Sequence, residues 1–192
     1  MDYFHVNLDF KPEKGDLLIS EPYLPDPNFE RTVILICEHD ENGTFGFVLN
    51  KLTDYSFDEV MELAENFDEK VFLGGPVQQD TLHFIHRSPE LFEQKKEIID
   101  GIYWGGEFDK LLSLINTKQI NKKDFKFFLG YSGWAEGQLD EELKAKSWIV
   151  YKKTTAAKVL DMSPESLWRQ ALSEMGGKFK MFANYPIDPN LN

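Results

Sequence analysis

The sequence contains one cysteine, Cys37, in 192 residues, so it cannot form an intrachain disulfide. Secreted domains more often carry paired cysteines, which favours a reducing compartment for this chain. No apolar run reaches the roughly 18–20 residues that a membrane-spanning helix requires. The N-terminal segment has neither the basic nor the apolar stretch of a secretory signal. We therefore expect a cytoplasmic protein that does not associate with membranes.

Positive charge is also scarce, because 21 Lys and Arg residues stand against 33 Asp and Glu, which gives a formal net charge of −12. Phosphate backbones and anionic lipid surfaces repel such a chain. The sequence contains no helix-turn-helix with a basic recognition helix and no phosphate-binding glycine loop. We therefore expect no direct contact with nucleic acid, and a regulatory role would run through a protein partner.

Hydrophobic residues make up 42% of the chain, and 16 residues are Phe, which is enough for one core with aromatic packing. No interior linker and no repeat is visible. We predict one domain over 1–192, with an N-terminal arm at 1–14 and a polar tail at 184–192. Predicted strands gather into hairpins while helices fall between them irregularly, an order that is typical of an α+β fold.

The clearest predicted elements are strands 32–38 and 45–50, which flank an Asn-Gly turn and should form a hairpin. Helix 56–67 begins with a capping box made by Ser56 and Glu59, and helix 163–175 begins with Ser163 before a proline. The other predicted strands are 16–20, 71–73, 81–86, 97–104, 125–131 and 147–151, and the other predicted helices are 108–115 and a segment that follows Gly133 and ends near 146.

A serine between glycines at a strand-to-helix turn is typical of a hydrolase nucleophile, and the sequence GYSGW puts Ser132 in such a position. However, Trp134 occupies a place that must be small, and all four histidines precede the serine, whereas the hydrolase order puts the histidine after it. An order with His39 first, then an acid and then Ser132, stays open. Otherwise Ser132 caps the helix that follows. That helix start offers free amides to an anion, but Glu136 and the acids after it compete for them.

Metal chemistry is not indicated by the histidines. His83 and His86 are three residues apart in a predicted strand, so they point to opposite faces and cannot share one metal ion. Cys37 shares a strand face with apolar residues, which is the position of a core thiol. The sequence therefore predicts no metal, no cofactor and no catalytic residues.

Arginine is rare, with three residues, and Arg31 lies directly before the predicted central strand and after a loop that contains three prolines. A planar guanidinium at such a place binds a carboxylate or phosphate ligand, or it pairs with an internal acid such as Glu38 or Glu136. The sequence leaves both readings open.

A series of motifs runs through the chain in a fixed order: GDLLIS (15–20), FERTVIL (29–35), GFVLN (46–50), GGPV (74–77), GYSGW (130–134), GQL (137–139), Glu142, Trp148 and the helix at 167–176. In these motifs the chain resembles the YqgE/AlgH family of small bacterial proteins. The resemblance implies a single α+β domain with a bifurcated, mostly antiparallel β-sheet that folds toward a pseudo-barrel with flanking helices. It implies no catalytic residues. The AlgH name belongs to a proposed regulator of alginate synthesis, and labels of transcriptional regulator derive from that name.

The candidate binding groove comprises Arg31, His39, Asn50, Ser132, Trp134 and Gln138. Its ligand would be a small anion, a peptide or a protein partner. The main hypothesis is a non-catalytic cytosolic binding or regulatory protein of this family, one form of which is transcriptional regulation through a protein partner. The alternatives are a hydrolase that uses Ser132 or His39, and a direct DNA-binding regulator, which the net charge disfavours.

Overall fold

The computed structural model describes residues 11–187, so parts of the predicted arm (1–10) and of the predicted tail (188–192) lie outside the described residues. The strands are β1 (Leu17–Ser20), β2 (Val33–Asp40), β3 (Gly43–Val48), β4 (Leu52–Ser56), β5 (Lys70–Leu73), β6 (Val77–His86), β7 (Lys96–Ile99), β8 (Ile102–Trp104), β9 (Phe125–Ala135) and β10 (Trp148–Tyr151). The helices are α1 (Phe57–Val60), α2 (Phe108–Asn116), α3 (Gln138–Lys144), α4 (Ala156–Leu160), α5 (Pro164–Met175) and α6 (Gly177–Phe182). No helix in this part of the chain has the length and apolar character needed to cross a bilayer.

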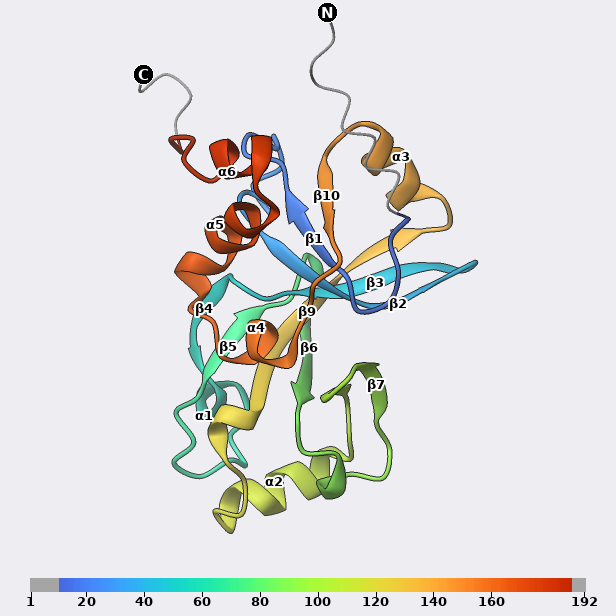
Figure 1. Ribbon diagram of the computed structural model, residues 1–192. Helices are drawn as coiled ribbons and strands as arrows, with labels where there is room; N and C mark the ends of the chain where they lie inside the picture. The colour runs from blue at the N-terminus through green and yellow to red at the C-terminus, as the bar shows by residue number, and fades with distance from the viewer. Residues whose placement is uncertain (1–10, 188–192) are drawn as a thin grey trace, which may run out of the picture.

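All the strands belong to one sheet, which has the order β10-β1-β2-β3-β9-β6-β8-β7 (Figure 1). The sheet divides at β9, because the C-terminal part of β9 pairs with β3 while its residues 127–129 pair with β5, which in turn pairs with β4. The β5–β9 pair is parallel and the other described pairs are antiparallel. The predicted bifurcated α+β sheet is confirmed. The sheet stays open, with β10 and β7 at its ends, and does not close into a barrel.

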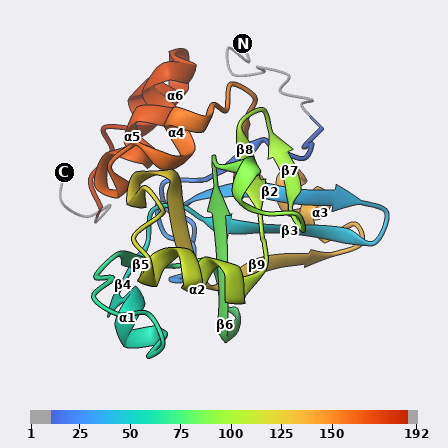
Figure 2. The same ribbon diagram turned by 90° about the horizontal axis from the view of Figure 1, so that it is seen from below.

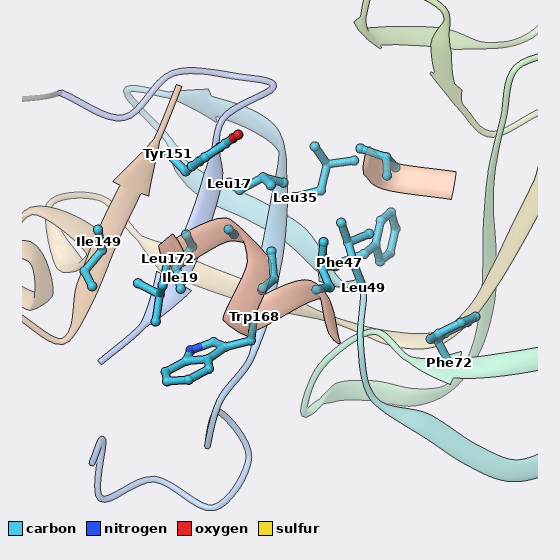
Figure 3. Packing of buried hydrophobic residues seen from close by; sticks show 14 of the residues in the cluster. Leu17, Ile19, Leu35, Phe47, Leu49, Phe72, Ile149, Tyr151, Trp168 and Leu172 are labelled. Carbon is cyan, nitrogen blue, oxygen red and sulfur yellow. The ribbon is translucent and has the colours of Figure 1, made fainter. Parts of the chain in front are cut away.

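Alternating side chains place apolar layers on both faces of the sheet. On one face, α4, α5 and α6 lie together (Figure 2), and Trp168 and Leu172 of α5 pack against strand residues such as Ile19 and Ile149 (Figure 3). On the other face, Leu139 of α3 belongs to a separate layer with side chains from β1, β2, β3 and β10. A third cluster, rich in Phe, fills the branch of the sheet near α1 and α2. The strand β10 is therefore bordered by α6 on one face and α3 on the other.

The β2–β3 hairpin, α2 and α5 are confirmed close to their predicted positions. The predicted helix 56–67 is wrong beyond its first turn. Its capping box is present, but α1 ends at Val60 because the chain then folds back, so that the Asp58 amide donates to the Phe67 carbonyl (3.2 Å). The predicted strand 97–104 is a hairpin of β7 and β8, which turns at Gly101 with a φ of 77°.

The buried cation Lys126 on β9 has 6% of its surface exposed. Its ammonium group donates to the carbonyl oxygen of Val159 (2.9 Å) and lies 4.6 Å from the ring centroid of Phe72. Burial lowers the pKa of Lys126 to about 8, although the charge of Asp161 opposes this shift. Below pH 8 both folded and unfolded chains carry this proton, so the folded state bears the whole cost of the buried charge.

Raising the pH above 8 should remove this cost. Between pH 8 and the ordinary lysine pKa, the unfolded chain holds a proton that the folded chain has lost, so stability attributable to Lys126 rises with pH. From pH 8 to pH 10, we expect the unfolding free energy of wild type to rise by about 2 kcal/mol relative to that of Lys126→Met. Urea unfolding at several pH values measures it. Exposed Lys180→Met is the control, and an equal shift there would contradict the assignment.

Candidate functional site

Arg31 lies at the end of the proline-rich loop with a φ of 49°. One guanidinium nitrogen donates to the carbonyl oxygens of Tyr185 (2.8 Å) and Pro186 (2.7 Å), and the group lies 4.8 Å above the ring centroid of Trp168. Neither acid named as a partner, Glu38 or Glu136, forms an ion pair with Arg31 within residues 11–187: Glu38 pairs with Lys96 (2.6 Å), and Arg31 contacts main-chain carbonyls. Arg31 therefore holds the chain that leaves α6 against α5.

Asn50 fixes the same loop from the other side. Its side-chain oxygen accepts from the Val33 amide (2.8 Å), and its side-chain nitrogen donates to the Arg31 carbonyl (2.9 Å). These two hydrogen bonds set the backbone of Arg31 in a conformation that is uncommon for a residue with a side chain. Asn50 is thus a positioning residue for the Arg31 loop.

Ser132 is not at a strand-to-helix corner, and this prediction is wrong. β9 continues to Ala135, and α3 begins at Gln138 after Gly137. Ser132 is fully buried in the sheet opposite Gly46, and its hydroxyl donates to the Gly74 carbonyl (3.1 Å). It does not cap α3, and because none of its surface is exposed, this hydroxyl is closed to a substrate.

His39 lies near the tip of the β2–β3 hairpin. Its Nδ1 is 2.6 Å from the hydroxyl oxygen of Thr44, its cross-strand neighbour. The ring borders a hollow of about 270 Å³ formed by the hairpin and the start of α3, which does not include Ser132. The structure therefore does not bring His39 and Ser132 together as a nucleophile and its base.

Trp134 and Gln138 meet at Glu142 on α3. One carboxylate oxygen of Glu142 accepts from the indole nitrogens of Trp134 (2.8 Å) and Trp148 (2.7 Å), and the other accepts from the side-chain nitrogen of Gln138 (3.1 Å). The side-chain oxygen of Gln138 accepts from the Ala135 amide (3.0 Å). Glu142 therefore joins β9, α3 and the first residue of β10.

Phe29 connects this cluster to the Arg31 loop. Its ring stacks against Trp134 with 6.4 Å between centroids and meets Trp148 edge-on at 5.3 Å. Aromatic pairs of these geometries stabilise the packing beyond the area that they bury. Arg31 and Trp134 were expected to line one groove. Instead, Arg31 contacts Trp168 of α5 and the chain after α6, whereas Trp134 contacts Glu142 of α3, which covers the other face of the sheet.

A hollow of about 590 Å³ lies between these two supports. Its walls come from the loop after β1, the end of α3, β10 and α6. Figure 1 shows where these elements lie in the fold. The lining residues are largely apolar: Leu24, Pro25, Leu143, Ala145, Trp148, Ile149, Val150, Phe179 and Phe182. We call this hollow the β10 groove. Because α3 and α6 cover opposite faces of the sheet, a hollow that touches both must lie at the sheet edge.

Three lysines also line the β10 groove: Lys144, whose ammonium group pairs with Glu141 (2.6 Å), and Lys146 at the end of α3, and Lys178 on α6. Glu21 is the acid among its lining residues, and its carboxylate accepts from the Tyr23 amide (3.0 Å). The groove therefore combines apolar walls with local positive charge on a chain whose formal net charge is −12. This reversal of sign favours an anionic ligand with apolar parts.

The sequence did not reveal this groove, because α6 was not predicted. The sequence predicted helix 163–175 and no helix after it, whereas α6 starts at Gly177, directly after the glycine that ends α5. The apolar spacing of Phe179, Phe182 and Ala183 was the signal that could have found it, since residues three and four apart share a helix face.

Metal ligands do not gather in the described part of the chain: no group of three or more His, Cys, Asp or Glu side chains within residues 11–187 could hold a metal ion. His86 contacts the Gly105 carbonyl through Nε2 (3.0 Å), and burial lowers the pKa of both His83 and His86. Cys37 is buried, and burial raises the pKa of its thiol well above the ordinary value. A raised pKa disfavours the reactive thiolate form.

These features define an open-sheet α+β protein with a cationic, apolar groove at one sheet edge. The chain belongs to the AlgH-like family, whose model matches residues 17–180. A UPF0301 protein of Cytophaga hutchinsonii is 46% identical over 180 residues, which cover 93% of this chain and 98% of that relative. A UPF0301 protein of Chlorobium limicola is 41% identical over 187 residues, covering 97% of this chain and all of the relative (100%).

Two solved structures share the fold. The solution structure of the AlgH protein from Pseudomonas aeruginosa has a TM-score of 0.70 and 27% identity, and covers 92% of this chain and 98% of that chain. A crystal structure of a Corynebacterium diphtheriae protein has a TM-score of 0.74 at 19% identity, and covers 92% of this chain and 94% of that chain. The second likeness is one of fold alone.

Proposed function

We propose that this protein is a non-catalytic binding protein, and that the β10 groove is where it takes up an anionic partner segment. The observation that carries the proposal is the sign of the charge: three lysines line an apolar hollow on a strongly acidic chain. Opposite charges attract a partner and orient it, while the apolar walls supply most of the affinity. A regulatory role would follow from binding a protein partner at this groove.

Two observations support a role without catalysis. The serine that resembles a nucleophile is buried in the sheet and bonded to a main-chain carbonyl. The groove is lined mainly by lysines and apolar residues. Among its lining residues in the described chain, we find no nucleophile with an adjacent base.

Charge reversal in the groove tests the proposal. The probe is an acetylated and amidated hexapeptide of alternating glutamate and valine, with a fluorescent label for anisotropy. We expect the double variant Lys146→Glu/Lys178→Glu to bind this probe at least about 10-fold more weakly than wild type, because two attractive charges become repulsive.

The matched control is Lys70→Glu/Lys110→Glu, on β5 and α2, which makes the same change of net charge at exposed lysines that do not line the groove. It should bind within about 3-fold of wild type at physiological salt, where distant surface charges are screened. Equal losses in both double variants, or no binding of the acidic probe to wild type, would contradict the proposal.

A further inference from the structure

The β10 groove follows the outer edge of β10, which pairs with no other strand within residues 11–187. In the antiparallel β1–β10 pair, Leu17 faces Tyr151 and Ile19 faces Ile149, and the same register brings the Glu21 amide to the Ser147 carbonyl (3.0 Å). Directly opposed residues alternate between hydrogen-bonded and non-bonded pairs. Residues 147, 149 and 151 therefore bond to β1. The main-chain groups of 148 and 150 point the other way, toward the outer edge.

The pairing of β1 with β2 gives an independent check of this register. The Ser20 amide donates to the Thr32 carbonyl (3.0 Å), so the even-numbered residues of β1 bond to β2. The odd-numbered residues of β1 are then the ones that bond to β10, which agrees with the Glu21 contact. Within residues 11–187, no strand pairs with the outer edge of β10, and no hydrogen bond reaches the main chain of Trp148 or Val150 from that side.

These outer main-chain groups belong to residues that line the groove. Trp148 is 4% exposed and Val150 is 7% exposed, and both line the hollow of about 590 Å³. A neighbouring hollow of about 310 Å³ continues along the strand and shares Val150, Lys178 and Phe179 with the first. An edge strand presents main-chain amides and carbonyls that have no strand partner, and such a row is a template for pairing with another extended segment.

We propose that the partner segment of the β10 groove is an acidic, extended peptide that adds to the sheet as a strand beside β10. This inference rests on the proposed function and names the ligand class and the binding mode. The amide and carbonyl of Trp148 and of Val150 bond to the main chain of the peptide, as in other cases of strand addition. A strand of four residues, the length of β10, spans about 13 Å.

The two sides of the groove set the side-chain pattern of the peptide. Residues of an added strand point alternately to the two faces of the sheet. Phe179 and Phe182 of α6 offer an apolar surface on one face, where Lys178 also lines the groove, whereas Lys144, the last residue of α3, and Lys146 lie on the other. The peptide that fits best therefore alternates apolar residues, directed to α6, with acidic residues, directed to the end of α3.

A second copy of this chain fits the edge less well. Two β10 edges brought together would place both sets of groove lysines beside each other, and each copy carries a formal charge of −12. Like charges in one interface oppose association. The charge of the groove therefore favours an acidic peptide of a different protein over self-pairing.

Backbone methylation of the probe peptide separates strand addition from binding by side chains alone. Two forms of the glutamate–valine hexapeptide carry N-methyl groups either on the glutamate amides or on the valine amides. In strand addition only alternate residues bond to β10, so one form should lose at least about 10-fold in affinity and the other should change by less than about 3-fold.

Each other outcome overturns strand addition. If the two methylated forms bind equally well or lose affinity equally, the groove holds the peptide by side chains, and the proposed function survives while the strand mode fails. If the unmethylated peptide does not bind, both fail. If sedimentation equilibrium shows a dimer and the Val150 amide is protected from exchange without peptide, a second copy occupies the edge.

Discussion

Glu142→Ala is expected to lower the free energy of unfolding by about 3 kcal/mol, because it leaves two indole N–H groups without an acceptor. These groups belong to Trp134 (6% exposed) and Trp148 (4% exposed), and one carboxylate oxygen of Glu142 accepts from both. A buried donor without a partner costs about 1–3 kcal/mol, so two such donors account for the expected loss. Urea unfolding followed by tryptophan fluorescence measures it.

The neighbouring residue provides the matched control. Glu141 is exposed, and its carboxylate pairs with Lys144 on the surface of α3 (2.6 Å). Exposed ion pairs of this kind contribute at most about 1 kcal/mol, so Glu141→Ala should change stability little. Glu142→Gln keeps an acceptor oxygen and should fall between the two. If Glu142→Ala is no more destabilising than Glu141→Ala, the carboxylate does not hold the two tryptophans.

Arg31→Ala is expected to lower stability by about 2–3 kcal/mol and to release the chain after α6. The substitution removes two charge-assisted hydrogen bonds to the carbonyls of Tyr185 and Pro186 and the contact with the Trp168 ring. Hydrogen exchange of α6 amides should become faster, because α6 loses the segment that ties it to α5. Affinity for the acidic probe should fall as well, since α6 forms one wall of the β10 groove.

Arg169→Ala is the control for this experiment, because it removes the same charge from an exposed position on α5. It should leave stability, exchange of α6 and affinity close to those of wild type. Should Arg31→Ala keep wild-type exchange in α6 while it weakens probe binding, Arg31 would act on the ligand directly and its assignment as a positioning residue would be wrong.

Local sequence signals predicted the parts of the fold that local chemistry determines. The Asn-Gly turn between two predicted strands indicated the β2–β3 hairpin, and Ser163 with Pro164 indicated the start of α5. Signals failed where distant contacts decide the structure. The capping box of α1 is present, but the helix stops after one turn because the following chain returns to contact its start.

Gly130 shows how a tertiary contact reversed a local interpretation. Glycines in the GYSGW motif suggested a turn, yet β9 runs through them. A Cβ at Gly130 would lie 2.7 Å from the Val77 carbonyl oxygen and 2.8 Å from that of Gly75, so the position needs glycine for close packing of main chains. Sequence alone does not distinguish such an approach from a turn.

The sequence did not predict the β10 groove itself, but it did select residues that hold the elements around it. Arg31, Asn50, Trp134 and Gln138 were selected as residues of one groove, and the structure shows that they position the loops and helices on either side of β10. The groove itself depends on the edge position of β10 and on α6. Strand order is a property of the whole sheet, so periodicity within one segment could not reveal which strand has a free edge.

The most direct measurement of the central claim is a ¹⁵N chemical-shift titration of the full chain with the glutamate–valine hexapeptide. If the β10 groove is the binding surface, the largest shifts should fall on the amides of Trp148, Val150 and Phe179 and on the indole N–H of Trp148. The hairpin around His39 and the buried Ser132 should stay near their free positions. Shifts concentrated on the His39 hollow, with β10 and α6 unchanged, would contradict the account.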